Sequence, residues 1–227
     1  MAFKQSIFRS CGPAAAGITA AAAALLPAVA GPVCAAAPTF SRASLANTAA
    51  FTVTNTVAPS GGGSKSVTVM RVEVKGSRAR LEYNNPALGA VTYLANEKGV
   101  FLYVPANKVA QKQNFQGGVD RALQFAFEQV SRQLRTAKKT GTATVSGQPT
   151  DVYKDAASGA IVYVGRAPGF RLPVKTTVTN VGGTRTLLVT NIKTNIALPD
   201  ARFAVPAGVQ VIAPSGNGAA GGFPGGL

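Results

Sequence analysis

A hairpin in the first half of the chain constrains the fold more than any other feature. Apolar and charged side chains alternate on both sides of Gly76-Ser77, a pair that suits a two-residue type II′ turn. Such a turn fixes which residues face each other across two antiparallel strands. The predicted apolar pairs are Val74–Ala79, Val72–Leu81 and Met70–Tyr83, and the predicted charge pairs are Glu73–Arg80 and Arg71–Glu82.

Two details of this hairpin do not fit a simple alternation. Lys75 faces Arg78 next to the turn, which places two like charges opposite each other. Upstream, Val67 and Val69 fall on the side of the charged residues. Either the start of the strand is covered on both sides, or a bulge near Val69 and Met70 resets the register.

A second predicted hairpin, over residues 90–105, turns through Asn96 to Gly99. Both arms carry apolar side chains on both faces of the sheet. Tyr93 and Leu94 show this in the first arm, and Phe101 and Leu102 show it in the second. A sheet with one face in water alternates, so these strands are predicted to be covered on both sides.

One helix is predicted, over residues 119–136, and it is the expected cover for the sheet. Asp120 is the candidate cap, and Glu128 and Arg132 have the spacing of a helical ion pair. Phe125 lies opposite the apolar stripe, either as an incidental exposed aromatic residue or as part of a second apolar surface that meets a ligand or a partner. The stripe itself consists of Val119, Leu123, Ala126, Phe127, Val130 and Leu134.

Strands return after Gly141 and are linked by short turns, such as those at residues 156–159 and 180–184. The pattern favours a mainly β fold with one or two helices. We expect a half-open antiparallel β-barrel, in effect a curved sheet, capped by a helical lid. Residues 213–227 have the composition of a disordered glycine-rich tail.

Residues 1–37 have the pattern of a secretory signal peptide, with Lys4 and Arg9 before an alanine-rich apolar segment. Cleavage is predicted near residues 35–37. A membrane anchor is the alternative, but the segment contains Pro27 and stops short of the roughly 20 strongly apolar residues that a span needs. Lipidation of Cys34 is less favoured, because the residue before such a cysteine is normally small. The protein is therefore expected to be periplasmic or otherwise exported.

The composition excludes several kinds of chemistry. The chain has no histidine, and both cysteines, Cys11 and Cys34, lie in the predicted signal segment. This removes Ser-His and Cys-His arrangements and any disulfide framework from the mature protein. The candidate carboxylates Glu73 and Glu82 belong to the charged face of the hairpin, and Asp151 and Asp155 lie beside turns. We expect no enzyme activity, no metal site and no cofactor.

The formal net charge is +15, but the basic residues are dispersed and their longest run is Lys138-Lys139. A dispersed excess does not indicate a nucleic-acid site. For an exported protein the expected anions are phospholipid head groups, lipopolysaccharide and acidic proteins, so the expected partner is an anionic membrane surface or a membrane protein. A solvated basic face without a partner is the plainer alternative.

The end of the chain carries a family resemblance. The sequence from Asn195 to Val211, "NIALPDARFAVPAGVQV", resembles the C-terminal signature of the LolA-like superfamily of lipoprotein carriers. Residues 169–195, 145–155 and the two hairpins resemble the family's other strands in the same order around one central helix, so the likeness covers residues 48–212. It implies an unclosed β-barrel with a helical lid that holds acyl chains.

Residue pattern and resemblance together predict a binder or carrier of acylated ligands, lipoprotein or lipid, in an apolar cavity under the lid. The alternative is a regulatory, sensor or structural interaction domain of the same fold with a closed interior. The acyl chains of lipoproteins or lipids are the expected partners, and no nucleic acid is expected. The predicted lining residues of cavity and lid are Val72, Val74, Leu81, Tyr83, Tyr93, Leu102, Leu123, Phe127, Val130 and Leu134.

Overall fold

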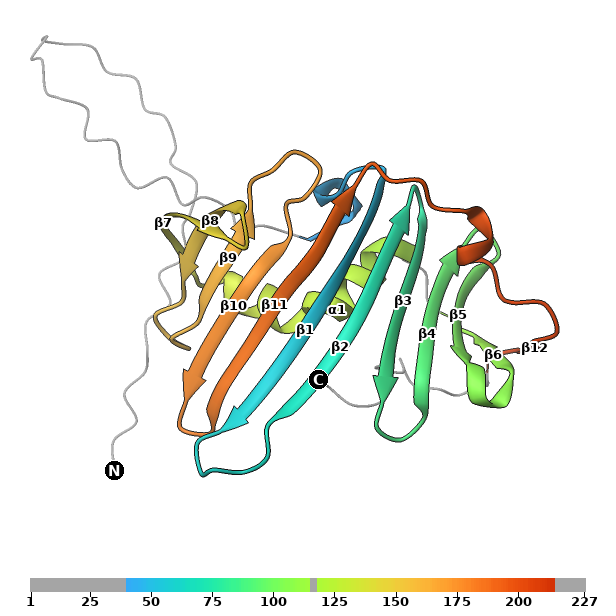
Figure 1. The fold of residues 1–227 in the computed structure, drawn as a ribbon, viewed down its shortest axis with the longest axis horizontal. Coiled ribbons are helices and arrows are strands. Elements are labelled where there is room, and N and C mark those ends of the chain that lie inside the picture. Colours follow the sequence, from blue (N-terminus) through green and yellow to red (C-terminus); the bar gives the residue numbers. More distant parts are fainter. Residues whose placement is uncertain (1–39, 115–117, 215–227) are drawn as a thin grey trace, which may run out of the picture. The chain divides into compact units, whose positions relative to one another are not determined.

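The computed structural model describes residues 40–114 and 118–214, which form one open sheet with a helix across one face (Figure 1). The strand order is β12-β6-β5-β4-β3-β2-β1-β11-β10-β9-β8-β7. The strands are β1 (Thr48–Pro59), β2 (Ser66–Lys75), β3 (Arg78–Asn85), β4 (Gly89–Asn96), β5 (Gly99–Val104), β6 (Val109–Lys112), β7 (Lys138–Val145), β8 (Gln148–Lys154), β9 (Ile161–Gly165), β10 (Pro173–Asn180), β11 (Gly183–Thr194) and β12 (Gln210–Ile212).

All neighbouring strands pair antiparallel except β12 and β6, which are parallel. The end strands β12 and β7 do not pair with each other, so the sheet stays open. The described helices are α1 (Gly118–Leu134) and the short 3-10 helices η1 (Arg42–Ser44), η2 (Pro105–Asn107) and η3 (Asp200–Phe203). The predicted architecture, a half-open curved sheet capped by one helix, is confirmed. We call the sheet face that packs against α1 the inner face and its opposite the outer face.

The register of the β2–β3 hairpin is the predicted one in every pair from Met70–Tyr83 to Lys75–Arg78. Gly76 has a φ of +57°, a value that glycine adopts without strain. The charged residues also lie opposite each other as predicted, Glu73 opposite Arg80 and Arg71 opposite Glu82, but other side chains bind the two glutamates. Glu73 instead receives two hydrogen bonds of 2.7 Å from Arg202, and Arg80 forms an ion pair with its strand neighbour Glu82.

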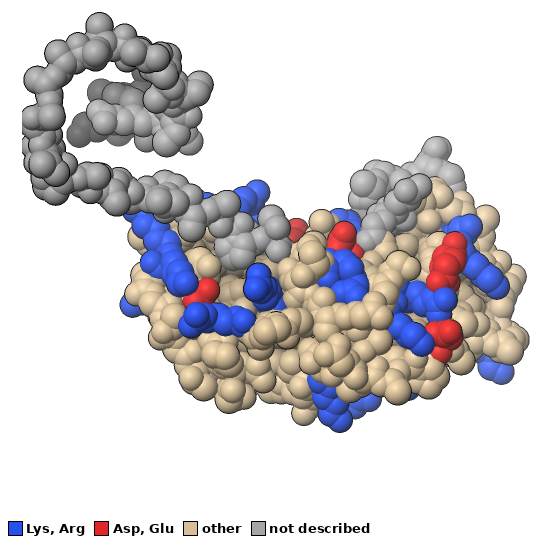
Figure 2. All heavy atoms as spheres, turned by 90° about the horizontal axis from the view of Figure 1, so that it is seen from above, with Lys and Arg blue, Asp and Glu red and all other residues tan. Residues whose placement is uncertain are grey.

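Asp200 resolves the like-charge pair beside the turn. Its carboxylate lies 2.6 Å from Lys75 Nζ and 2.8 Å from Arg78 Nη1. The hydrogen bond from Lys75 is the main reason that the pKa of Asp200 lies below its ordinary value. Figure 2 shows acidic side chains set among basic ones at this end of the sheet. The C-terminal segment is thus fixed to the hairpin by charge.

The first residues of β2 show neither the bulge near Val69 and Met70 nor the cover on both sides that the sequence suggests. The pairing of β1 with β2 runs from Thr48–Lys75 to Val57–Ser66 without a register shift, so no bulge is present there. Val67 and Val69 are 53% and 46% exposed on the outer face, so no second cover is present among the described residues. At the N-terminal end of β2, exposed valines take the outward positions that charged residues occupy in the rest of the strand.

The second hairpin is covered on both sides, as its apolar arms predict. On the inner face Val91, Tyr93 and Val100 join the core under α1. On the outer face Leu94, Phe101 and Ala110 form a second cluster, against which Tyr103, Val205 and Val209 pack. The outer cover is therefore the C-terminal segment of residues 198–212. The Asn96 side chain also donates a hydrogen bond of 2.7 Å to the Phe203 carbonyl.

Several predictions fall outside the described residues. They are the signal peptide of residues 1–37 with Cys34, and most of the glycine-rich tail. Among the residues that the structure describes, no helix is long and apolar enough to cross a membrane.

Candidate functional site

The candidate site is the apolar layer between α1 and the inner face of the sheet. The helix begins at Gly118 and ends at Leu134, close to the predicted 119–136. Every residue of the predicted stripe is buried. Arg132 lies 4.0 Å from Glu128, as the spacing predicts. Phe127 departs from helical geometry, with φ −127° and ψ 17°, so the helix is irregular at its most buried aromatic residue.

The structure brings the predicted lining residues together. All of them belong to one continuous core cluster or, in the case of Leu102, pack against it while only partly buried. Val72, Val74, Leu81 and Leu123 have no exposed surface. An acyl chain that enters this layer must therefore displace α1 or exchange places with side chains.

Aromatic residues that the sequence analysis missed form the centre of this layer. The Phe127 ring lies 5.8 Å from Phe40 and 6.2 Å from Phe51, between ring centroids. Phe170 meets Phe51 edge to face at 5.4 Å. Phe51 is the one aromatic residue of β1. Phe40 lies in a lead-in of polar appearance that gave no signal of burial.

Phe125 is neither fully exposed nor buried, and it extends the apolar layer beyond the stripe. Its ring lies 5.5 Å from that of Tyr83 and packs against the core cluster. The description of Phe125 as an incidental exposed aromatic residue is therefore wrong. Its position marks a side of α1 where apolar surface continues toward solvent.

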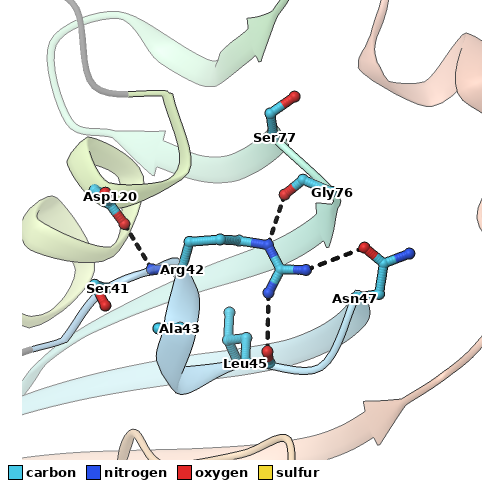
Figure 3. A pocket seen from close by; sticks show the side chains of 8 residues that line it. All are labelled: Ser41, Arg42, Ala43, Leu45, Asn47, Gly76, Ser77 and Asp120. Carbon is cyan, nitrogen blue, oxygen red and sulfur yellow. Dashed lines mark hydrogen bonds between the residues drawn. The ribbon is translucent and has the colours of Figure 1, made fainter.

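The N-terminal end of α1 is tied to two other elements through Arg42 (Figure 3). The guanidinium donates to the Gly76 carbonyl at 2.6 Å and to the Leu45 carbonyl at 2.9 Å. The backbone N–H of Arg42 donates to Asp120 Oδ1 at 2.6 Å. Asp120 is the third helical residue, so the prediction that it caps the helix is wrong and it holds η1 instead.

An open pocket of about 660 Å³ lies at this junction. Because the guanidinium of Arg42 already donates to protein oxygens, including Asn47 Oδ1 at 3.3 Å, it serves as a structural tie. The residues that line the pocket are Ser41, Arg42, Ala43, Leu45, Asn47, Gly76, Ser77 and Asp120.

Tyr93 supports the same end of the helix from the sheet. Its hydroxyl donates to the Gly118 carbonyl at 3.1 Å, and burial raises the pKa of its phenol to about 12. The folded protein thus keeps a proton that the unfolded chain loses near the ordinary value of 10.0. Stability from this group is complete below about pH 10 and is lost as the pH rises toward about 12.

We expect Tyr93→Phe to reduce the free energy of unfolding by about 1 kcal/mol at pH 7, because one buried hydrogen bond is lost. The variant should also lose less stability than the wild type between pH 7 and 11, by about 1.4 kcal/mol. Urea denaturation at both pH values measures this. Tyr163→Phe, on the outer face, is the matched control and should keep the wild-type loss. An equal alkaline loss in Tyr93→Phe and wild type would contradict the assignment.

The carboxylates considered as catalytic candidates have structural contacts. Glu73 and Glu82 are bound by arginines on the outer face. Asp155 accepts hydrogen bonds from Thr136 and from Ser158, and the Ser158 hydroxyl is the main reason that its pKa lies below the ordinary value. Asp151 lies 2.9 Å from Lys139. Within residues 40–114 and 118–214, no group of three metal-binding side chains comes together.

Solved structures offer a comparison at the level of the fold. An uncharacterized conserved protein from Thermus thermophilus shares 14% identity over 75% of this chain and 92% of that chain, with a TM-score of 0.47. A LolA superfamily protein from Nitrosomonas europaea shares 10% identity over 70% and 90%, with a TM-score of 0.32. A putative outer membrane lipoprotein-sorting protein domain from Vibrio parahaemolyticus shares 13% identity over 69% and 89%, with a TM-score of 0.31.

At these identities and TM-scores the matches are likenesses of fold alone. Neither a protein-family model nor a curated protein matches the chain.

Proposed function

We propose that the protein is an exported binder or carrier of acylated ligands, lipoprotein or lipid, and not an enzyme. The observation that carries the proposal is the apolar layer itself. Side chains from β2, β3, β4 and α1 converge in it, and a single amphipathic helix covers it. An acyl chain gains about 0.8 kcal/mol for each methylene group that it buries in such a layer.

The helix has the attachments expected of a lid that opens. In the described part of the chain, its first turn accepts hydrogen bonds from Tyr93 and from the Arg42 backbone. Gly118, at the start of the helix, has a φ of +39°, and a Cβ atom there would lie 3.3 Å from the Ser77 carbonyl oxygen. A glycine at this point can absorb backbone rotation when the helix moves, as hinge residues do.

Partners and location follow from the same proposal. The acyl chains of lipoproteins or lipids are the cargo, and the basic surface favours approach to an anionic membrane surface or a membrane protein partner. Export depends on the signal peptide of residues 1–37. N-terminal sequencing of protein from the periplasmic fraction should give a start near residues 35–38, whereas an uncleaved cytoplasmic protein would contradict export.

A regulatory, sensor or structural interaction domain with a closed interior is the second candidate. The nearly complete burial of Val72, Leu81, Leu123 and Phe127 favours it, because a sealed core has the same appearance. The two candidates differ in whether the apolar layer exchanges its contents with solvent.

Lipid analysis distinguishes the candidates. Protein purified from its own host without detergent is extracted, and the extract is examined by mass spectrometry for acylated compounds. In parallel, a fluorescent fatty acid is titrated into delipidated protein and displaced with unlabelled lipid. We expect acylated material in stoichiometric amount and saturable, displaceable probe binding. Absence of both would support the closed domain.

A further inference from the structure

A charged side chain lies at the contact between α1 and the sheet. Arg185 belongs to β11, which passes in front of α1 in the view of Figure 1. It pairs with Val178 across β10 and with Val57 across β1, so its side chain lies on the inner face. Its Nη1 donates a hydrogen bond to Gln129 Oε1 of α1. The helix and the sheet are thus joined here by a cation.

The charge of Arg185 is not compensated within the described part of the chain. No described Asp or Glu forms an ion pair with it, and its Nε is buried without a hydrogen-bond partner. Burial, and then the charge of Arg132, lowers the pKa of Arg185. The nearby carboxylate of Glu128 is paired with Arg132 instead. Arg185 and Arg132 thus lie close enough to repel each other, and the one ion pair that either forms among the described residues, Arg132 with Glu128, is long at 4.0 Å.

Two more polar groups in the same region lack partners. Thr176 faces Leu187 across β10 and β11, which makes it a diagonal neighbour of Arg185 on the same face, at roughly 7–8 Å. Its hydroxyl oxygen is buried and unpaired, and Thr176 is only 4% exposed. Gln133 lies one helical turn beyond Gln129, and its Oε1 is also buried without a partner. Rotation of that amide would present its N–H donors instead.

Buried polar groups without partners are uncommon in folded proteins and often mark a place where another molecule binds. The unpaired groups here are the Nε of a guanidinium, a hydroxyl and one amide oxygen, and the Gln129 amide adjoins them through its hydrogen bond from Arg185. A guanidinium is the side chain that best matches the two oxygen atoms of a carboxylate or phosphate, and partial burial strengthens the contact. Such a set of donors suits an anion at the border of the apolar layer.

We propose that Arg185, with Gln129, Thr176 and Gln133, binds the anionic head group of the acylated ligand. The head group is a carboxylate or a phosphate, and the acyl chain extends from it into the apolar layer beneath α1. This inference rests on the proposed function and adds to it the chemical class of the ligand. It predicts that the protein distinguishes acidic lipids from neutral lipids of equal chain length.

The test compares four ligands on delipidated full-length protein by displacement of a fluorescent fatty acid. Oleate and oleyl alcohol share the chain and differ in charge, and phosphatidic acid and diacylglycerol form the corresponding pair with phosphate. Wild-type protein should bind at least one acid about tenfold more tightly than its neutral partner. A preference for oleate over oleyl alcohol would identify the head group as a carboxylate. A preference for phosphatidic acid over diacylglycerol would identify it as a phosphate.

Arg185→Gln should abolish this preference and leave the affinity for the neutral ligand unchanged. Arg185→Lys should retain part of it, because a lysine keeps the charge without the planar fork. Lys175→Gln removes a charge from β10 on the outer face, where Lys175 lies over the Tyr163 ring, and should behave as wild type. Thermal unfolding of each variant establishes that it is folded under the conditions of the assay.

The outcomes separate the two proposals. If acids and neutral lipids bind equally, or if Arg185→Gln keeps the preference, the head-group site is refuted while the binding function stands. If no acylated ligand binds the wild type, both proposals fail.

Discussion

Phe127→Gln is expected to lower the free energy of unfolding by about 3 kcal/mol and to weaken acyl binding about tenfold or more. Phe127 is 1% exposed and its ring contacts Phe40 and Phe51, so a polar amide there loses apolar contacts and is itself poorly solvated. The loss should lie at the low end of the ~3–5 kcal/mol seen for large core residues, because a lid side chain also serves a state in which it meets ligand.

The measurement pairs urea denaturation with probe titration well below the unfolding midpoint, where the variant is folded. A second variant, with a disulfide engineered between α1 and the underlying strands, tests whether the helix must move. The cysteine positions need Cβ atoms about 3.5–4.5 Å apart. We expect the oxidised form to exclude the probe and the reduced form to admit it. Normal uptake by the oxidised form, together with collapse of Phe127→Gln, would contradict the lid.

The parts of the fold that the sequence predicts well depend on contacts between near neighbours. The β2–β3 register followed from Gly76-Ser77 and from side-chain alternation, both of which lie within a few residues of the pairs that they determine. The helix followed from its periodic stripe. In each case the local sequence is enough to determine the element, because turn geometry or amphipathicity restricts the backbone without help from distant residues.

The errors came from residues that are distant in the sequence. Arg80 lies opposite Glu73 across the hairpin, as predicted, but Arg202, which lies far along the chain, forms the hydrogen bonds to Glu73. Asp200 similarly neutralises the unfavourable Lys75–Arg78 pair. A surface charge chooses among several partners of similar energy, since an exposed ion pair contributes only about 0–1 kcal/mol. Alternation along a strand therefore cannot identify the partner.

In the candidate site too, local patterns predict some residues, and contacts between distant residues determine others. The predicted lining residues were found from strand parity and helix periodicity, and the structure places them in one cluster. Phe40 was missed because one aromatic residue in a polar lead-in has no period. Arg185 was missed because an arginine in an alternating strand resembles a solvated charge, and only its contact with Gln129 shows that it lies under the helix.

The C-terminal segment leads to a prediction that separates stability from binding. Phe203 is 1% exposed, as Phe127 is, but its segment covers the outer face of the sheet. Phe203→Gln is therefore a matched substitution of equal burial on the opposite face. We expect it to lower the free energy of unfolding by about 3 kcal/mol or more, since the hydrogen bond from Asn96 to its carbonyl cannot replace the lost apolar contacts.

The folded fraction of Phe203→Gln should bind acyl probe with wild-type affinity, because the outer cover does not take part in the apolar layer under α1. Probe titration and urea denaturation, run on both glutamine variants in the same buffer, provide the comparison. Equal stability losses with a binding defect in Phe127→Gln alone would show that the two faces have different roles. A comparable loss of affinity in Phe203→Gln would instead mean that any loosening of the sheet impairs binding, and the lid would then have no specific part in it.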